Sequence, residues 1–267
     1  MAAGPPRISV VIPTYQRLEA CKRAVSSALE QELPALEVLV CDDGSTDGTE
    51  EHLREWAQRE PRLRYMRLPH NHGTPAPARN LGIQQARGDW IALLDSDDQW
   101  LPSKLAVQNQ FISAGRYDVI ASDAAKVSGG AYFGLSLPRE PTRDEFLIHN
   151  PIIVSTAVAR RSLLLSVGGF PRSVGGFKIT GVEDYGAWLA LVTLGARFLV
   201  IPRQLVTYAD SGDRMSSAVA RQEASVAAVR WRLWLRRPHD VALLRSALRG
   251  TLDAVRSRIR GSVGVTS

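Results

Sequence analysis

The sequence of 267 residues predicts an α/β fold with a mostly parallel central sheet, helices on both faces of that sheet and a C-terminal helical tail. Apolar runs typical of buried strands alternate four times with segments in which apolar residues recur at helical spacing. Such alternation is typical of a parallel sheet covered on both faces. From residue 221 onward, ten arginines stand against three acidic residues. We therefore expect two halves of one domain, at 1–115 and 116–218, followed by a basic amphipathic tail at 219–267.

Four strand–helix units make up the first half of the chain. Each strand is a short apolar run that polar residues or proline follow directly. Each helix carries apolar residues three and four positions apart. We expect glycine at position 88 to close the third helix, since glycine adopts the left-handed conformation common at helix C-termini. Strands are expected at 8–12, 36–41, 63–68 and 90–94, and helices at 20–29, ahead of Pro61, ahead of Gly88 and from near Pro102.

The second half of the chain is less regular. One longer helix begins at Glu183 and ends at Gly195, and it carries an apolar stripe. Short strands are expected at 117–121, 152–158 and 198–201, a short helix at 162–167, and loops at 175–180 and 208–217.

Polar residues follow three of the predicted strands, at 13–15, 42–43 and 95–98. The carboxyl ends of parallel strands lie at one edge of a sheet, and ligands bind beyond that edge. We therefore expect these three segments to form one binding site.

The segment at 95–98 has three carboxylates in four residues, which repel one another unless a cation meets them. In an extended segment, Asp95 and Asp97 point the same way and can share a hydrated divalent ion or a sugar hydroxyl. Mg²⁺ and Mn²⁺ favour such oxygen ligands and complete their coordination with substrate phosphates. The alternative is a solvated acidic turn in which Asp98 caps the helix near Pro102.

Composition indicates an ordinary globular protein, with 45% hydrophobic and 22% charged residues. Two cysteines argue against a disulfide framework and favour a reducing compartment. The first residues lack the apolar core of a signal peptide, and no apolar run approaches the ~18 residues of a membrane span. We expect a cytoplasmic protein.

The basic tail has two interpretations. Apolar residues at 241, 244, 248, 252, 255 and 259 form one stripe of a helix, and Arg245, Arg249, Arg256 and Arg260 line up beside it. Such a helix suits the surface of an anionic membrane, here its inner face. It equally suits packing on its own domain or on a second subunit, so a homodimer is left open. Nucleic acid is not expected as a partner, because no recognised nucleic-acid motif accompanies the charge.

Five segments resemble the family 2 glycosyltransferases in order and spacing: VVIPTYQR at 10–17, CDDGSTDGT at 41–49, PARNLGIQQARGDWIALLDSDD at 77–98, GGF at 168–170 and EDYGAWLAL at 183–191. The resemblance covers about residues 8–217. It implies a GT-A fold, a nucleotide-diphosphate-sugar donor, a divalent cation (Mg or Mn) and inversion at the anomeric carbon.

The resemblance also implies roles on the donor side. Asp97, with Asp98 beside it, holds the metal ion that bridges the diphosphate oxygens. Asp95 hydrogen-bonds the ribose or the sugar. The nucleobase contacts fall to Asp43 as hydrogen-bond acceptor, Tyr15 beside the ring, and Pro13 with Thr14 as a backbone wall.

Inverting transfer needs a base that takes the proton of the acceptor hydroxyl. Asp184 matches the family position of that base, and Glu183 is its neighbour. The alternative is that both acids simply favour the first turn of a helix. Trp188, one turn further on, either walls the acceptor site or belongs to the core.

Two further positions leave alternatives open. Arg79 matches a residue that reaches the donor, but it could instead form an ion pair with Asp42 or Asp89. Many family members carry a histidine in the loop after the last strand, where this chain has Ser211. The sequence does not settle which residue of that loop, if any, contacts the donor.

We therefore expect an inverting, metal-dependent glycosyltransferase that uses a UDP-, GDP- or dTDP-sugar and a glycan or lipid-linked acceptor in cell-surface glycan synthesis. A nucleotide-sugar-binding relative without activity is a second class, which the set Asp95, Asp97 and Asp184 disfavours. A nucleotidyltransferase is a third class. It would need a basic phosphate-binding loop, and 13–18 offers only Arg17.

Overall fold

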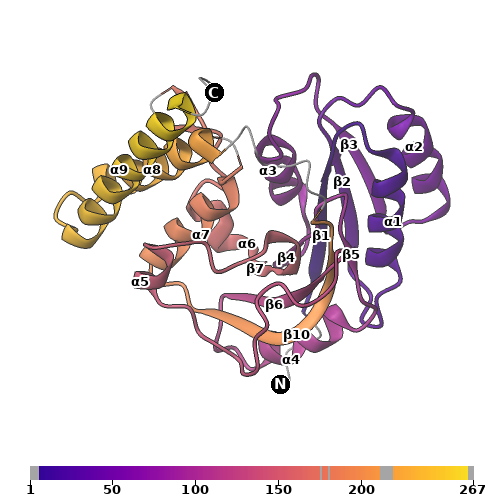
Figure 1. Ribbon diagram of the computed structural model, residues 1–267. Coiled ribbons are helices and arrows are strands. Elements are labelled where there is room, and N and C mark those ends of the chain that lie inside the picture. The colour runs from indigo at the N-terminus through magenta and orange to yellow at the C-terminus, as the bar shows by residue number, and fades with distance from the viewer. Residues whose placement is uncertain (1–5, 175, 180, 211–218, 264–267) are drawn as a thin grey trace.

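The computed structural model of the protein describes residues 6–174, 176–179, 181–210 and 219–263. An eight-stranded curled sheet forms its centre, in the order β3-β2-β1-β4-β7-β6-β10-β5 (Figure 1). The strands are β1 (Ile8–Thr14), β2 (Glu37–Asp42), β3 (Leu63–Arg67), β4 (Trp90–Leu93), β5 (Gln99–Trp100), β6 (Val119–Lys126), β7 (Val158–Arg160) and β10 (Phe198–Tyr208). A small hairpin of β8 (Ser173–Val174) and β9 (Phe177–Lys178) stands apart from the sheet.

Parallel pairing predominates in this sheet. Strands β3, β2, β1 and β4 are parallel neighbours, as are β6 and β10. Strand β7 runs antiparallel between β4 and β6, and β5 runs antiparallel along β10. The predicted α/β class with a mostly parallel sheet is confirmed, although the second half mixes strand directions.

Helices cover both faces of the sheet. The alternating side chains of β1 show the division, since Val11 belongs to the core on one face, and Val10 and Ile12 belong to the core on the other. The first core includes residues of α3 (Ala76–Gln85), α6 (Arg161–Ser166) and α7 (Glu183–Thr193). The second includes residues of α1 (Leu18–Leu29), α2 (Thr49–Arg59) and α4 (Lys104–Ser113). Short helices α5 (Arg143–Phe146) and η1 (Val154–Thr156) complete this part of the chain.

Strand β1 continues past the expected stop at Pro13. The Val11 carbonyl faces β4, where it accepts from the Leu94 N–H at 3.1 Å, and Pro13 faces the same side two residues later. Pairing with β4 ends at Val11, so no ladder bond requires a Pro13 N–H. On the other side, the Thr14 carbonyl accepts from the Asp43 N–H at 2.9 Å, which carries the pairing with β2 to the strand end.

Gly88 does not close the third helix, so that prediction is wrong. Helix α3 ends at Gln85 with the extended residue Ala86 as its C-cap. A Cβ atom at Gly88 would lie 2.7 Å from the Arg7 carbonyl oxygen and the Ser9 nitrogen. Glycine is therefore needed there because the chain passes close to the start of β1.

The structure also bears on other expectations. Trp188 is fully buried against Phe170 and Phe198, so it belongs to the core rather than to an acceptor wall. Strand β10 extends to Tyr208, well beyond 201, and the two-residue strand β5 was not foreseen. The loop expected at 208–217 lies mostly outside the described residues, which stop at 210 and resume at 219.

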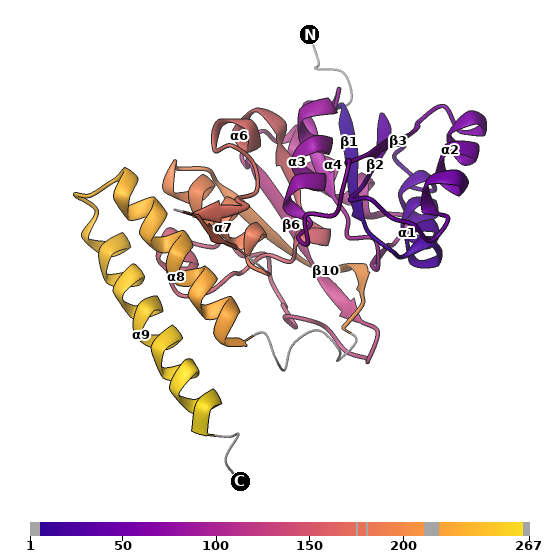
Figure 2. The same cartoon turned by 90° about the horizontal axis from the view of Figure 1, so that it is seen from above.

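The tail forms two antiparallel helices, α8 (Val219–Arg236) and α9 (Val241–Val263), beside α7 (Figures 1 and 2). Val229, Leu233 and Leu243 are buried in the same core as α3 and α7. The buried Arg230 guanidinium donates to the Tyr185 hydroxyl, the Ile148 carbonyl and the Ser246 carbonyl, at 3.0–3.3 Å. The tail is therefore packed on its own domain, which was one of the two interpretations of its sequence.

Candidate functional site

One cavity of about 1030 Å³ opens at the carboxyl ends of the parallel strands. Its lining comes from the loops after β1, β2, β3 and β4, from the first turn of α7 and from α8. Of the ten site residues predicted from the sequence, Asp98 alone does not line it. The nine that do are Pro13, Thr14, Tyr15, Asp43, Arg79, Asp95, Asp97, Glu183 and Asp184.

The loop after β1 is fastened to the loop after β2. Gln16 adopts a left-handed backbone conformation, with φ of 52°, and its N–H donates to the Ser45 hydroxyl at 2.9 Å. Its side-chain amide bonds Thr46 at 2.8 Å. These bonds hold Tyr15 at the cavity wall with 40% of its surface exposed. From this position its side chain can pack against a planar ring bound in the cavity.

Asp43 is buried and bound to His72. One carboxylate oxygen accepts from the His72 N–H at 2.8 Å, and the other lies 2.7 Å from its Nδ1. This pair joins the loop after β2 to the loop after β3. No local sequence signal identifies His72, because contact with Asp43 depends on how two loops 29 residues apart fold together.

Arg79 and Asp95 form a largely buried ion pair in the lining of the cavity. The ion-pair partner is thus Asp95, not Asp42 or Asp89. Burial works to lower the pKa of Arg79, but the charges of Asp95, Asp184 and Glu183 outweigh it and raise that pKa. The guanidinium also lies 5.3 Å from the centre of the Phe170 ring. A fixed positive charge therefore stands among the acids of the site.

Asp97 and Asp98 are adjacent but lie in different surroundings. Asp97 lines the cavity and accepts from the half-exposed Arg17 at 2.5 Å. Asp98 is buried, where it accepts from the Ser155 hydroxyl at 2.5 Å and from the Ala209 N–H at 2.8 Å. Burial and the nearby Asp95 charge raise the pKa of Asp98 to about 7. Asp98 thus fastens the strand end to the segment after β10, and it does not cap α4, which begins at Lys104 with Ser103 as its N-cap.

The charge of the cavity is negative. Six carboxylates and three guanidinium groups line it among the described residues: Asp43, Asp95, Asp97, Glu183, Asp184 and Asp210 against Arg17, Arg79 and Arg230. No cluster of three or more metal-ligating side chains occurs within the described ranges. The lining instead fits a Mg²⁺- or Mn²⁺-type site in which one or two carboxylates act together with substrate phosphates and water.

Asp184 and Glu183 occupy the first turn of α7 and face different partners. Glu183 is buried and accepts from the Thr74 hydroxyl of the loop after β3. Asp184 is partly exposed to the cavity, and one of its oxygens accepts from the Asn150 amide at 2.9 Å. Burial raises the pKa of Asp184 to about 6, with Arg79 and the Tyr185 N–H acting against the shift and Glu183 and Asp95 adding to it. Asp184 therefore has the access and the pKa of a general base.

Several lining residues were not predicted from the sequence. Asn150 reaches Asp184 from the segment after α5, and its side-chain oxygen Oδ1 accepts from the Ile152 N–H at 3.2 Å. The lining also includes Tyr132, Ile148, His149, Ile152, and Gln222, Val226 and Arg230 of α8. They occur in no local motif, because strands and helices distant in sequence bring them together.

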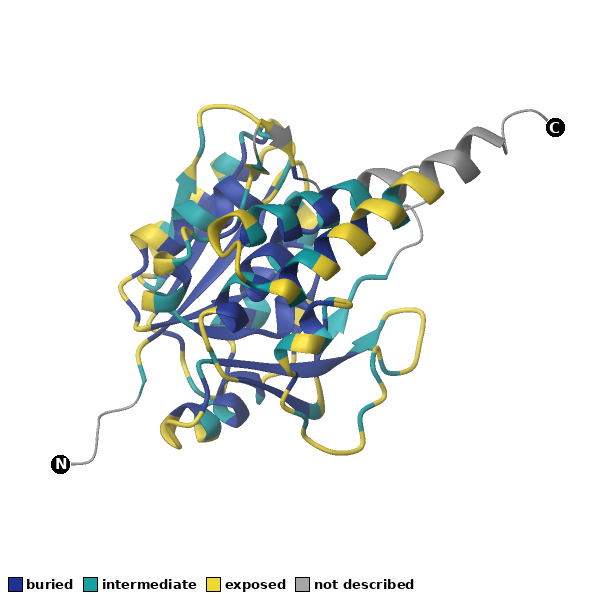
Figure 3. Cartoon of the chain, turned by 90° about the vertical axis from the view of Figure 1, so that its left-hand side faces the viewer, coloured by how far each residue is buried: buried dark blue, intermediate teal, exposed yellow. Residues whose placement is uncertain are grey.

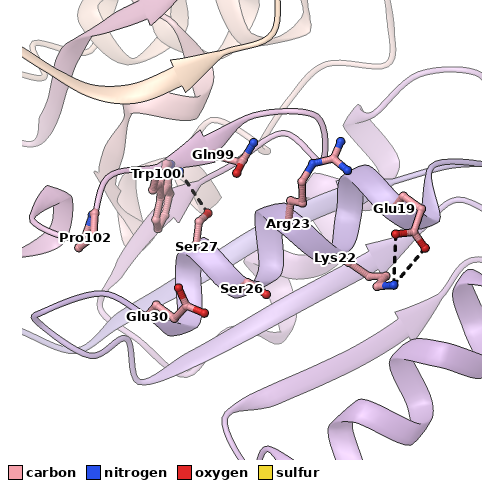
Figure 4. A pocket seen from close by; sticks show the side chains of 9 residues that line it. All are labelled: Glu19, Lys22, Arg23, Ser26, Ser27, Glu30, Gln99, Trp100 and Pro102. Atoms are coloured by element: carbon pink, nitrogen blue, oxygen red, sulfur yellow. Dashed lines mark hydrogen bonds and ion pairs between the residues drawn. The ribbon is translucent and has the colours of Figure 1, made fainter. Parts of the chain in front are cut away.

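A second, smaller cavity of about 400 Å³ lies between α1 and β5 (Figure 4). Its lining includes the Lys22–Glu19 ion pair and the Ser27 hydroxyl, which accepts from the Trp100 N–H at 3.1 Å. None of the predicted site residues lies in it. The cavity at the strand ends is therefore the candidate active site.

Comparison with protein-family models gives a match to "Glycosyl transferase family 2" over residues 9–162. A curated relative, the putative teichuronic acid biosynthesis glycosyltransferase TuaG of Bacillus subtilis, is 28% identical over 200 residues, which cover 71% of this chain and 73% of TuaG. The Escherichia coli enzyme WfgD is a UDP-Glc:alpha-D-GlcNAc-diphosphoundecaprenol beta-1,3-glucosyltransferase. It is 28% identical over 69% of each chain. Three uncharacterized Rickettsia glycosyltransferases also match, and each alignment covers only 18–30% of the length of the Rickettsia protein.

Solved structures share the fold. Staphylococcus aureus TarS 1–349 in complex with UDP-GlcNAc superposes with a TM-score of 0.70 at 24% identity, over 85% of this chain and 66% of that one. The mannosyltransferase PcManGT of Pyrobaculum calidifontis, in complex with GDP-Man and Mn²⁺, gives a TM-score of 0.66 at 20% identity, over 100% of this chain and 82% of that one. At these identities the similarity establishes the fold, which is the GT-A-like arrangement that the sequence motifs imply.

Proposed function

The chain belongs to glycosyl transferase family 2, and on that premise we propose that its cavity transfers a sugar from a nucleotide-diphosphate-sugar to an acceptor hydroxyl, with inversion at the anomeric carbon. The observation that carries the proposal is the lining of this one cavity. It brings residues at the strand ends, numbered between 13 and 97, together with Asp184 of α7. A donor bound at the strand ends then has a carboxylate base within the same cavity.

In the proposal, the nucleoside lies against Tyr15, Asp43 and the backbone of Pro13 and Thr14. Asp95 accepts from a hydroxyl of the ribose or of the sugar. Its ion pair with Arg79 holds that carboxylate in place, which reduces the freedom it would lose on binding. His72 holds the Asp43 carboxylate in place for the nucleobase in the same way.

A divalent cation is the proposed cofactor, held by Asp97. The negative lining of the cavity supports this, because a diphosphate brought among surplus carboxylates needs positive charge. When bound, Mg²⁺ or Mn²⁺ would neutralise the diphosphate and ease its departure. Asp98 is not included as a ligand, because protein donors already bind its oxygens. Arg17, now paired with Asp97, would turn toward solvent or toward the phosphates.

Asp184 is the proposed base. With a pKa of about 6, it is ionised at neutral pH and still basic enough to take the proton of an acceptor hydroxyl within hydrogen-bond reach. The Asn150 amide donates to this carboxylate and so favours its ionised form. Glu183, bound to Thr74, holds the first turn of α7 against the loop after β3 rather than moving a proton.

The acceptor binds in the part of the cavity between the 148–153 segment and α8. Apolar side chains of Ile148, Ile152 and Val226 alternate there with His149 and Gln222, a lining that suits the faces and hydroxyls of a sugar. Relatives act in teichuronic acid synthesis and on a diphosphoundecaprenol-linked sugar, so we propose a lipid-linked acceptor in cell-surface glycan synthesis. The chain then works at the inner face of the cell membrane as a peripheral protein. No helix among the described residues is long and apolar enough to cross a membrane.

The decisive experiment is a thermal-shift screen with UDP, GDP and dTDP, each with and without Mn²⁺. A ligand at 100 times its Kd stabilises the native state by ~2.7 kcal/mol, which raises Tm by roughly 5–10 °C for a chain of this size. One nucleotide should raise Tm, and Mn²⁺ should enlarge the rise. If none of the three nucleotides changes Tm in the presence of Mn²⁺, the proposed donor site is wrong.

A further inference from the structure

Helix α9 has two apolar faces, and only one of them is used by the fold. Leu243, Ser246, Ala247 and Gly250 are buried and face α8 and the domain. The contact is close, since a Cβ atom at Gly250 would lie 3.3 Å from the Ala227 Cα. This face contains mostly small residues, which allow two helices to approach each other.

The second face lies opposite. At 3.6 residues per turn, Val241, Leu248, Leu252 and Val255 are centred about 160° around the axis from the buried face. These four side chains are 48–58% exposed, and Leu235 near the turn between the helices is 67% exposed. Figure 3 shows exposed residues recurring along the outer side of α9 over its described length. We call this row, from Val241 to Val255, the outer stripe.

Arginines flank the outer stripe on one side. Arg245, Arg249 and Arg256 are exposed and centred about 70° from it. The nearby acids do little to balance them, because Asp240 is paired with Arg143 from the domain, and Asp253 lies 3.9 Å from Arg256. Arg236 and Arg237 at the end of α8 are also exposed.

We propose that the outer stripe docks on an anionic lipid bilayer, with its valines and leucines in the interface and the arginines against lipid phosphates. An apolar row with a cationic flank is the pattern of helices that lie in a membrane surface. A second copy of the chain is a poorer occupant, since antiparallel pairing of two such stripes would bring like arginine rows together. The two interpretations of the tail sequence therefore apply together, each to its own face of α9.

This docking deepens the proposed function, because it rests on an acceptor held at a membrane. Helix α8, which α9 covers, contributes Gln222, Val226 and Arg230 to the cavity. A membrane contact on α9 would therefore hold the proposed acceptor side of the cavity close to the lipid surface.

The test is sedimentation of the full chain with vesicles of phosphatidylcholine containing about one-third phosphatidylglycerol, compared with phosphatidylcholine alone. The wild type should sediment with the anionic vesicles and be released at about 1 M salt, where the screening length falls to ~3 Å. The variant Arg245→Gln/Arg249→Gln/Arg256→Gln should lose about 100-fold in partition, since each arginine near an anionic surface contributes about fivefold. Leu248→Gln/Leu252→Gln should also fail to bind, which separates a docked stripe from a diffuse charge effect.

The matched control is Arg54→Gln/Arg59→Gln/Arg87→Gln, which removes the same charge from exposed positions on α2 and ahead of β4. It should sediment like the wild type. Equal losses in both triple variants, or no sedimentation of the wild type at low salt, would overturn the proposal. The proposal would also be overturned if light scattering shows a dimer of the wild type that the Leu248→Gln/Leu252→Gln variant does not form, because a second copy would then cover the stripe. The nucleotide-induced rise in Tm is measured on the wild type and on the same variants. If the wild type binds anionic vesicles but no nucleotide raises its Tm, the result counts against the proposed function alone.

Discussion

Replacing Asn150 with alanine should shift the pH dependence of the reaction without lowering its maximum. The Asn150 amide donates to Asp184 at 2.9 Å, and a donor favours the ionised form of a carboxyl group. Hydrogen bonds to charged groups contribute about 1.5–3 kcal/mol, and we take the lower end because the cavity is open to water. That value corresponds to about one pKa unit.

The expected shift sets the size of the effect. Burial raises the pKa of Asp184 to about 6, and the active form of a base is the ionised one. Activity is therefore full at alkaline pH and falls as pH drops through 6. In Asn150→Ala the midpoint moves to about 7, so that at pH 6 the ionised fraction falls from one half to about one-tenth. The variant should be about fivefold slower than the wild type at pH 6 and equal to it at about pH 8.5.

The assay follows release of the nucleoside diphosphate from the donor that the thermal-shift screen identifies, by transfer to acceptor or to water, from about pH 5 to 9. Asn109→Ala is the matched control, because Asn109 on α4 bonds Ser113 and does not line the cavity. Its profile should match the wild type. A uniform loss of rate in Asn150→Ala with an unmoved midpoint would refute the idea that Asn150 acts through the proton of Asp184. A wild-type profile that stays flat down to pH 5 would refute Asp184 as the base.

Three further outcomes follow from the same contacts. Asp97→Asn should weaken Mn²⁺-dependent binding of the nucleoside diphosphate about tenfold or more in titration calorimetry, and unchanged affinity would remove Asp97 as the ligand. Asp184→Asn should slow turnover by roughly 10²–10⁴. It should also raise Tm by a few degrees at pH 7.5 but not at pH 3.5. The pKa of Asp184 is higher in the folded chain than in the unfolded one, so its ionisation lowers the stability of the fold once the pH rises above the pKa of the unfolded chain. Ending the chain after Arg237 removes Leu243 and Ala247 from the core, where a lost leucine alone costs about 2–5 kcal/mol, so Tm should fall by at least roughly 5 °C in calorimetry. An unchanged Tm would mean that α9 does not pack on the domain.

Much of the donor half could be predicted from sequence, because its signals are local. An apolar run followed directly by polar residues identifies a strand and its carboxyl end, and parallel order then brings Tyr15, Asp43 and Asp97 to one edge. The same logic gave the helix that starts at Glu183. Where a local rule failed, tertiary contact was the reason. Gly88 has the residue type of a helix end, but it lies against the start of β1.

The rest depends on contacts between distant segments. Nothing near Asn150 in the chain points to Asp184, which lies 34 residues away and arrives on another helix. Asp98 has the same residue type and sequence setting as Asp97, and only the arrival of Ser155 and Ala209 buries one and leaves the other in the cavity. For α9, the sequence shows the regular Leu and Val spacing that turns out to face outward. Apart from Leu243, the buried face consists of Ser246, Ala247 and Gly250, which carry little hydrophobic signal.

The contribution of α8 to the lining of the cavity has a consequence for how this chain could be re-engineered. The family match ends at residue 162, whereas Gln222, Val226 and Arg230 enter the cavity from beyond it. Contacts between the two-helix tail and the domain include the buried Arg230, the ion pair of Asp240 with Arg143 and a patch of apolar residues. The tail shares the core of α3 and α7 and contributes one wall of the cavity. A chimaera that keeps residues 1–210 and takes its tail from a relative should keep its nucleotide preference and change its choice of acceptor.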